Sequence, residues 1–177
     1  PSAFWSGPRS DVDSAFTGML SFAMRKVVLK TVTLFALAAG AAFAGDLSSP
    51  DVLDIVRKSK SAADSGDDAN AIAILDIAVR DIPDAGILFL TRGLLLQRNR
   101  KDDAAILDFS RSIELGFRPA LSYASRGVSR MSDADPKPAI GDFDSALRID
   151  PKLAFVRVLR GRLLYESGQF SDALGDF

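Results

Sequence analysis

The stretch TRGLLLQRNRKDDAAILDF, at residues 91–109, decides the fold of this chain because the markers at its two ends recur at a fixed distance. Its Arg-Gly pair and its Asp-Phe pair return in SRGVSRMSDADPKPAIGDF at residues 125–143 and in LRGRLLYESGQFSDALGDF at residues 159–177. Each pair stands 34 residues after the previous copy. Alanine keeps the same step at Ala105, Ala139 and Ala173. Several independent markers in one phase indicate a tandem repeat whose units stack on one another.

Each unit contains two stretches with the apolar spacing of a helix. In the unit quoted first, these stretches lie at residues 87–95 and 105–113, with apolar residues three or four apart. Asp135 and Ser171 precede second stretches, where we expect them to cap a helix. A proline at each junction between units marks where one helix ends and the next begins: Pro83, Pro119 and Pro151. The pattern therefore predicts pairs of antiparallel helices.

The period and its markers resemble the tetratricopeptide repeat family, in which a small residue stands at repeat position 8, Ala at 20 and an aromatic residue at 24. Placing position 8 on each glycine gives units at 52–85, 86–119, 120–153 and, truncated, 154–177. The first unit departs from the pattern with Ser59 at position 8 and Leu75 at position 24. The resemblance implies an all-α protein, an α-solenoid of antiparallel helix pairs wound into a superhelix. We expect the small residues to let paired helices approach closely.

An arginine and an aspartate recur together in this frame. Position 7 holds Arg92, Arg126 and Arg160, and position 23 of the same units holds Asp108, Asp142 and Asp176. The first unit lacks both, with Lys58 and Ile74 instead. Joint presence and absence predicts an ion pair between helices, with guanidinium and carboxylate within about 4 Å. A functional arginine ladder is the alternative interpretation.

The segment that begins at Met24 reads MRKVVLKTVTLFALAAGAAFA and is typical of a signal peptide. Basic residues come first, an apolar run follows, and the run ends in the small-x-small pattern that precedes cleavage after Ala44. The uncharged run at 31–45 is shorter than the roughly 20 residues that span a bilayer. An uncleaved membrane anchor is the alternative; after cleavage we expect no stable membrane span.

This interpretation divides the N-terminal part of the chain into three pieces. Residues 1–23 would be an unstructured upstream extension, 24–44 the signal peptide and 45–51 a linker to the array. The mature protein would be periplasmic or secreted, as in a bacterium. At the other end, Ala173, Leu174 and Phe177 are apolar positions with no following helix in the sequence, so we expect the chain to be a fragment of a longer protein.

Composition excludes several kinds of chemistry. The chain has no cysteine and no histidine, which removes disulfides, thiolate and imidazole metal sites, and catalytic triads with a histidine base. The formal net charge is −1, so no basic patch for nucleic acid is indicated. We expect neither an enzyme nor a protein with a cofactor or a metal.

The resemblance implies a peptide- or protein-binding groove on the concave face, lined by the first helices at positions 2, 5, 9, 12 and 13. The candidate residues at these positions are Ile87, Leu90, Leu94, Gln97, Arg98, Leu121, Val128, Met131, Phe155, Val158, Arg162 and Tyr165. The apolar members would hold apolar anchors, and Arg98 and Arg162 would pair with a carboxylate. In the alternative interpretation, several apolar members only pack between neighbouring first helices.

The sequence thus favours a protein-interaction scaffold or adaptor in the cell envelope, with a peptide or protein of unknown identity as its ligand. Two alternatives belong to other classes. The array would be the recognition arm of a larger enzyme whose catalytic domain follows it, or it would mediate self-association only.

Overall fold

The computed structural model describes residues 50–177, so the predicted extension, signal peptide and most of the linker lie outside the described residues. Within this range the chain forms eight helices. Their bounds are α2 (Pro50–Asp64), α3 (Asp68–Asp81), α4 (Gly86–Arg98), α5 (Asp102–Glu114), α6 (Pro119–Arg130), α7 (Lys137–Ile149), α8 (Ala154–Glu166) and α9 (Phe170–Leu174). No strand occurs between residues 50 and 177.

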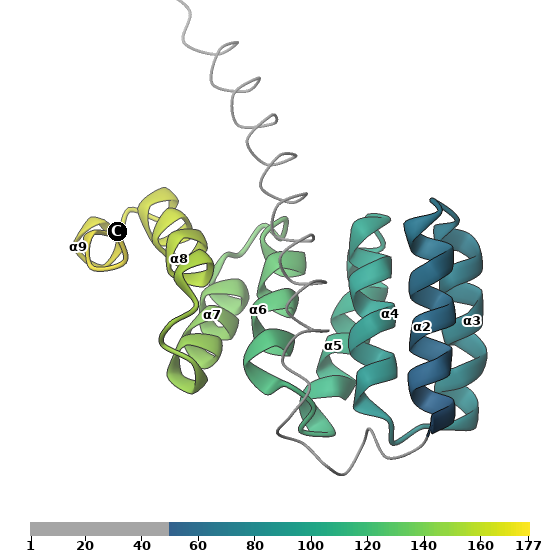
Figure 1. Cartoon of the computed structure of the whole chain (residues 1–177). Coiled ribbons are helices and arrows are strands. Elements are labelled where there is room, and N and C mark those ends of the chain that lie inside the picture. The colour runs from purple at the N-terminus through teal and green to yellow at the C-terminus, as the bar shows by residue number, and fades with distance from the viewer. Residues whose placement is uncertain (1–49) are drawn as a thin grey trace, which may run out of the picture. The chain divides into compact units, whose positions relative to one another are not determined.

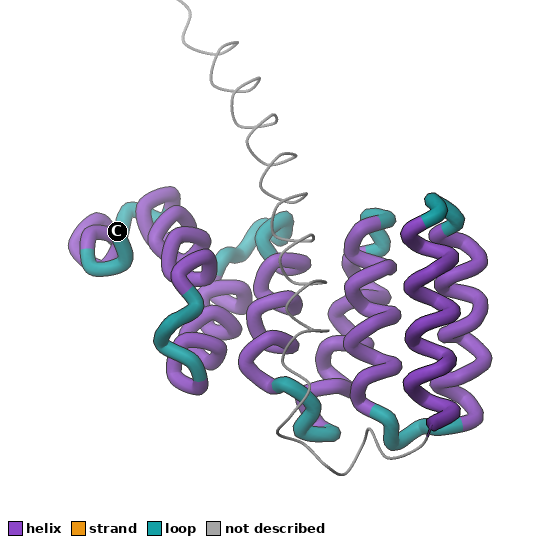
Figure 2. The backbone as a smooth tube through the Cα atoms, viewed as in Figure 1, coloured by secondary structure: helices purple, strands orange, loops and turns teal. Residues whose placement is uncertain are grey.

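The helices pair as hairpins that stack side by side (Figure 1). Each first helix (α2, α4, α6 and α8) packs against the second helix that follows it, and each second helix packs against the first helix of the next unit. The first helices α2, α4 and α6 also touch one another in turn. Figure 2 shows that only loops and turns join the helices in this part of the chain. The described part of the chain is an all-α solenoid.

Close approach of two helices explains the glycine marker. A Cβ added to Gly93 would lie 2.7 Å from Cε1 of Phe109, and one added to Gly127 would lie 2.6 Å from Cε1 of Phe143. Both phenylalanine rings are completely buried. Position 8 is therefore small because the position-24 ring of the second helix occupies the space of its side chain. The expectation of close helix approach is confirmed at these positions.

The first unit solves the same packing problem with other residues. Ser59 is completely buried at position 8, and its hydroxyl donates to the backbone carbonyl of Ala71 at 3.1 Å. Leu75, also fully buried, stands where the other units have phenylalanine. Leu75 on the second helix is narrower than the phenylalanine of the other units, and Ser59 on the first helix is larger than their glycine. The two changes therefore compensate for each other.

The predicted caps differ in outcome. Asp135 lies one residue before the N-cap position of α7, which Pro136 occupies, but it still accepts a hydrogen bond from the backbone N–H of Lys137, the first residue of the helix, at 3.1 Å. Ser171 does not cap α9, because the helix already begins at Phe170, so that prediction is wrong. Asp67 is the N-cap of α3, since its side chain accepts a hydrogen bond from the backbone N–H of Asn70 at 3.1 Å.

The turn between the two helices has a left-handed residue at repeat position 15 in three of the four units. In the first and fourth units this residue is Gly66 and Gly168, with φ of 89° and 76°. Arg100 occupies the same repeat position in the second unit and adopts φ of 62°, a region that is unfavourable for residues with a Cβ. The second unit thus keeps the geometry of this turn without the glycine, whereas the third unit, with Ala134 at this position, has no left-handed residue there.

Candidate functional site

The twelve predicted binding residues lie on first helices, except for Met131, which directly follows α6, and they occupy three kinds of environment. We call the side of the array that their positions define the first-helix face, since residues three or four apart lie along one side of a helix. The buried members are Leu90, Leu94, Gln97 and Val128. The half-buried members are Ile87, Leu121, Met131, Phe155 and Arg162. The exposed members are Arg98, Val158 and Tyr165.

Gln97 joins two first helices. Its side-chain amide in α4 donates to the backbone carbonyl of Ser125 at 2.8 Å and to the hydroxyl of Ser129 at 2.7 Å, both in α6. All three residues are buried. A buried amide that is satisfied in this way fixes the two helices relative to each other. Gln97 therefore acts as a packing residue in this structure.

The buried apolar members also pack inside the array. Val128 belongs to a core cluster formed by α6, α7 and α8, with Phe143, Val156 and Leu163 among its members. Met131 and Phe155 pack against this cluster from its margin. For the buried residues the alternative interpretation, packing between helices, describes what the structure shows. Ligand contact without rearrangement is left to the exposed and half-buried members.

Arg98 is exposed but already paired. Its Nε donates to Asp68 Oδ2 at 2.8 Å, and a second bond runs from its terminal nitrogen to Asp68 Oδ1. Asn99 donates to the same carboxylate at 2.8 Å. Partial burial lowers the pKa of Arg98. A carboxylate of a ligand has to compete with Asp68 for this guanidinium.

The most exposed apolar part of the first-helix face lies on α8. Val158 is 39% exposed and Tyr165 is 61% exposed. The Tyr165 ring meets the ring of Phe170 edge to face, with 5.2 Å between centroids and 67° between planes. Arg162 stands between Val158 and Tyr165 along the helix and donates to Glu166 at 2.7 Å. We call Val158, Arg162, Tyr165 and Phe170 the α8 patch.

Phe170 was not among the predicted binding residues because it belongs to α9, a second helix. It is 57% exposed. The sequence does single out Phe170, because Asp68 and Asp102 hold the same repeat position in the first two units. The fourth unit has an aromatic residue where those two units have an aspartate.

The predicted Arg–Asp ion pairs are confirmed in all three units. The distance from Arg NH2 to Asp Oδ1 is 2.6 Å for Arg92 and Asp108, 2.7 Å for Arg126 and Asp142, and 2.5 Å for Arg160 and Asp176. In each pair Nε also donates to the second carboxylate oxygen. Such bidentate pairs fix the relative orientation of the two side chains in addition to bringing opposite charges together.

Pairing with Arg92 has to offset the cost of burying the charged Asp108 carboxylate. Burial raises the pKa of Asp108, and the hydrogen bonds from Arg92 oppose that effect. The same hydrogen bonds raise the pKa of Arg92, which keeps the guanidinium charged. Desolvation and attraction nearly offset each other in buried pairs, so the pair specifies helix position more than it adds net stability.

Other site types are absent from the described range. No helix between residues 50 and 177 is long and apolar enough to cross a membrane. The same residues contain no group of three or more acidic side chains arranged to hold a metal ion.

Comparison with known proteins gives the fold its name. No protein-family model and no curated protein matches the chain. A crystal structure of MamA matches with a TM-score of 0.67 at 17% identity, over 98% of this chain and 92% of that chain. The first TPR of Spaghetti (RPAP3), bound to the HSP90 peptide SRMEEVD, matches with a TM-score of 0.64 at 18% identity, over 70% of this chain and 98% of that chain. The Arabidopsis OM64 TPR domain matches with a TM-score of 0.60 at 19% identity, over 67% of this chain and 97% of that chain.

The chain has the tetratricopeptide repeat fold. Its TPR array carries the α8 patch on the first-helix face and the Arg–Asp pairs between the helices of each unit. In the RPAP3 structure an array of this fold holds a peptide that contains two glutamates and a C-terminal aspartate. At these identities the similarity concerns the fold, and the residues of this chain have to carry any functional argument.

Proposed function

We propose that this TPR array is a protein-interaction module, with no catalytic activity of its own, that binds a peptide or protein partner on its first-helix face. The exposed Val158 and Tyr165, with Phe170 against the tyrosine ring, are the observation that carries the proposal. Exposed aromatic side chains beside an arginine are the residue types that contribute most to binding at protein interfaces.

The ion pairs of the two face arginines indicate which one a ligand reaches more easily. Arg162 is held by one bond to Glu166 on its own helix, an exposed pair of the kind that contributes under about 1 kcal/mol. Arg98 belongs to a network in which Asp68 also accepts from Asn99. We therefore propose an apolar or aromatic anchor on the α8 patch, with an acidic group of the ligand at Arg162.

The proposed location is the cell envelope. It rests on the sequence of residues 24–44, with basic residues, an apolar run and the Ala42-Phe43-Ala44 motif. Expression of the chain in a Gram-negative bacterium, followed by fractionation and N-terminal sequencing, tests it. We expect a periplasmic product that begins at Gly45; a product found only in the cytoplasm with an intact leader would refute the location.

Selection of peptides from a random library against the full chain tests the binding function. We expect selected peptides to bind with lower affinity when Tyr165 is replaced by Ser, by tenfold or more, which corresponds to about 1.4 kcal/mol. Leu107→Ser is the matched control, since Leu107 is an apolar residue on the second helix α5 that is 72% exposed, against 61% for Tyr165. Equal affinities for the wild type and Tyr165→Ser would contradict the proposed face.

A further inference from the structure

Each position-7 arginine joins two neighbouring units. We call such an arginine with its acceptors a rung. In the Arg92 rung, the guanidinium pairs with Asp108 of its own unit and with Asp76 of the preceding unit, at 2.9 Å from NH1 to Oδ1. In the Arg160 rung the corresponding partners are Asp176 and, at 2.6 Å from NH1, Asp144. Each of these rungs supplies two carboxylates for one guanidinium.

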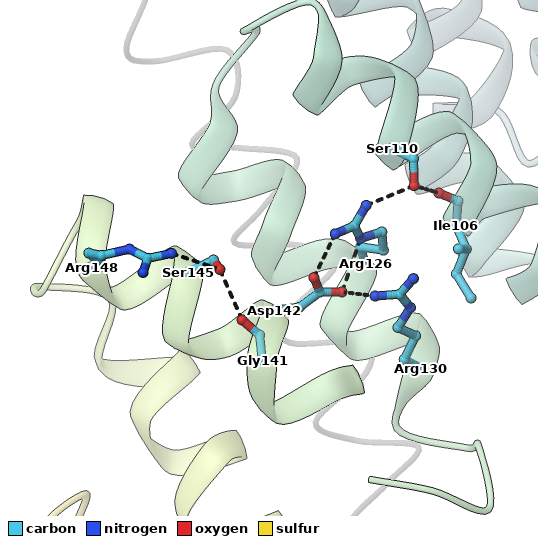
Figure 3. A network of polar contacts seen from close by, with 8 residues as sticks. All are labelled: Ile106, Ser110, Arg126, Arg130, Gly141, Asp142, Ser145 and Arg148. Carbon is cyan, nitrogen blue, oxygen red and sulfur yellow. Dashed lines mark hydrogen bonds and ion pairs between the residues drawn. The ribbon is translucent and has the colours of Figure 1, made fainter. Parts of the chain in front are cut away.

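The middle rung has the opposite balance of charge. NH1 of Arg126 meets the hydroxyl of Ser110 at 2.9 Å, where the other rungs have an aspartate. A second guanidinium, that of Arg130, lies 2.8 Å from Asp142 Oδ2. Figure 3 shows Asp142 held by both arginines, with Ser110 on the far side of Arg126. Two guanidinium groups share one carboxylate here.

Ser110 does not compensate for the missing charge. Its hydroxyl hydrogen is directed to the backbone carbonyl of Ile106 at 2.7 Å, so Arg126 finds only a neutral oxygen lone pair. Serine is also shorter than aspartate. The rung therefore lacks the carboxylate that the equivalent position supplies in the other two rungs.

The middle rung lies away from the first-helix face. Arg126 stands two residues from Ala124 and from Val128, which is roughly 200° around the helix axis. Arg130 follows one turn later on the same side of α6. The side chains of Arg126 and Arg130 keep 17% and 25% of their surface exposed, so solvent and solutes reach them.

From this we infer a second binding site, in which the guanidinium groups of Arg126 and Arg130 bind a carboxylate from an acidic side chain of a partner protein, beside Ser110. The two other rungs of the same molecule show that a carboxylate is held beside the NH1 group of the position-7 arginine. A charge-assisted bond to an excess guanidinium group is the strong kind of polar contact. The partner thus completes the middle rung as Asp76 and Asp144 complete the others.

Arginine Nε–H signals in a two-dimensional NMR spectrum of the full chain test this site directly. The probe is the acetylated and amidated tripeptide Asp-Glu-Asp, with Asn-Gln-Asn as the uncharged control. We expect saturable shifts at Arg126 and Arg130 that are several times larger than those at Arg92 and Arg160, and that shrink with added salt. Equal shifts at all four arginines, or no shifts, would overturn the site. Inorganic phosphate that shifts the same signals equally well would overturn the assignment to a carboxylate.

Ser110→Asp is the decisive variant because it supplies the carboxylate within the chain. We expect it to melt at a higher temperature than the wild type and to lose the response to Asp-Glu-Asp. Arg130→Gln leaves the Arg126–Asp142 pair in place and balances the charge, so we expect a folded protein whose response is also lost. A Ser110→Asp or Arg130→Gln protein that responds as the wild type does would refute the inference.

Discussion

Gly127 of α6 lies against the ring of Phe143 in α7, so closely that a Cβ on residue 127 would be 2.6 Å from the ring carbon Cε1. Gly93 and Phe109 repeat the relationship one unit earlier. The glycine of the Arg-Gly marker and the phenylalanine of the Asp-Phe marker are therefore two sides of one contact. This contact explains why both markers recur with the same period.

Replacement of Gly127 by Ala should destabilise the array. The added methyl group displaces a fully buried ring, and overpacking of this kind costs about 1–3 kcal/mol. Higher helix propensity returns up to about 1 kcal/mol of that loss. Urea denaturation followed by circular dichroism measures the difference.

Gly141 of α7 is the matched control for this substitution. A Cβ added there would meet nothing within 4 Å, so Gly141→Ala should raise the free energy of unfolding by about 0.5–1 kcal/mol. A Gly127→Ala protein as stable as Gly141→Ala would show that the Phe143 ring does not limit the space at position 8.

Replacement of Arg92 by Met should reveal the buried charge of Asp108. The carboxylate side chain is 5% exposed, and removing one partner of a buried pair costs about 3–5 kcal/mol. Burial already raises the pKa of Asp108, and loss of the opposing Arg92 bonds raises it further. A raised pKa in the folded state adds stability below the unfolded value, about 3.9, and this stability is lost as the pH rises through the folded value.

The instability of Arg92→Met should therefore be largest near neutral pH and shrink as the pH falls to about 4. Urea denaturation of the variant and the wild type across this range measures it. A double variant, Arg92→Met with Asp108→Leu, should recover much of the loss, since no unpaired charge remains. An instability that grows on acidification would contradict this account of Asp108.

Replacement of Arg100 by Gly should stabilise the chain. Arg100 adopts φ of 62°, and a left-handed conformation costs a residue with a Cβ about 1–2 kcal/mol. Because glycine also has more freedom in the unfolded chain, we expect a net gain of about 1 kcal/mol or less. Gly66→Ala, at φ of 89° with no atom within 4 Å of the added Cβ, should lower the free energy of unfolding by a similar amount. Thermal melting of both variants tests this. Melting temperatures that shift in the same direction for the two variants would exclude backbone strain as the cause.

Replacement of Gln97 by Ala tests whether this residue packs or binds. The variant loses two bonds and leaves a buried carbonyl and hydroxyl in α6 with fewer partners, which should cost about 1–3 kcal/mol. Ser129→Ala, which removes one acceptor, should cost less. If the Gln97→Ala protein is as stable as the wild type but binds selected peptides more weakly, Gln97 contacts the ligand and is a binding residue after all.

Much of the fold could be predicted from the sequence because the residues that recur every 34 positions contact one another between the helices of each unit. The Gly127–Phe143 contact and the Arg126–Asp142 pair both join helices of one unit, so each leaves a trace at a fixed spacing. The cap at Ser171 was predicted wrongly, because a hydroxyl residue one position inside the helix looks the same in sequence as one before it.

The binding residues were harder to predict because burial depends on neighbouring helices as well as on repeat position. Leu90 and Val158 share position 5, yet Leu90 is buried and Val158 is partly exposed. Leu90 lies in α4, which has first helices packed on both of its sides. Similarly, the second acceptor of each position-7 arginine lies in the preceding unit, and its residue type recurs only in part, since Asp76 and Asp144 are aspartates but Ser110 is not.

Photo-crosslinking in living cells tests the central claim, binding at the α8 patch, most directly. A photoreactive phenylalanine derivative is placed at Tyr165 in one full-length variant and at Leu107 of α5 in another, since both side chains are exposed. The account predicts a discrete crosslinked partner from residue 165, displaced by a selected peptide, and none from residue 107. A partner captured from residue 107 alone, or from neither residue, would contradict it.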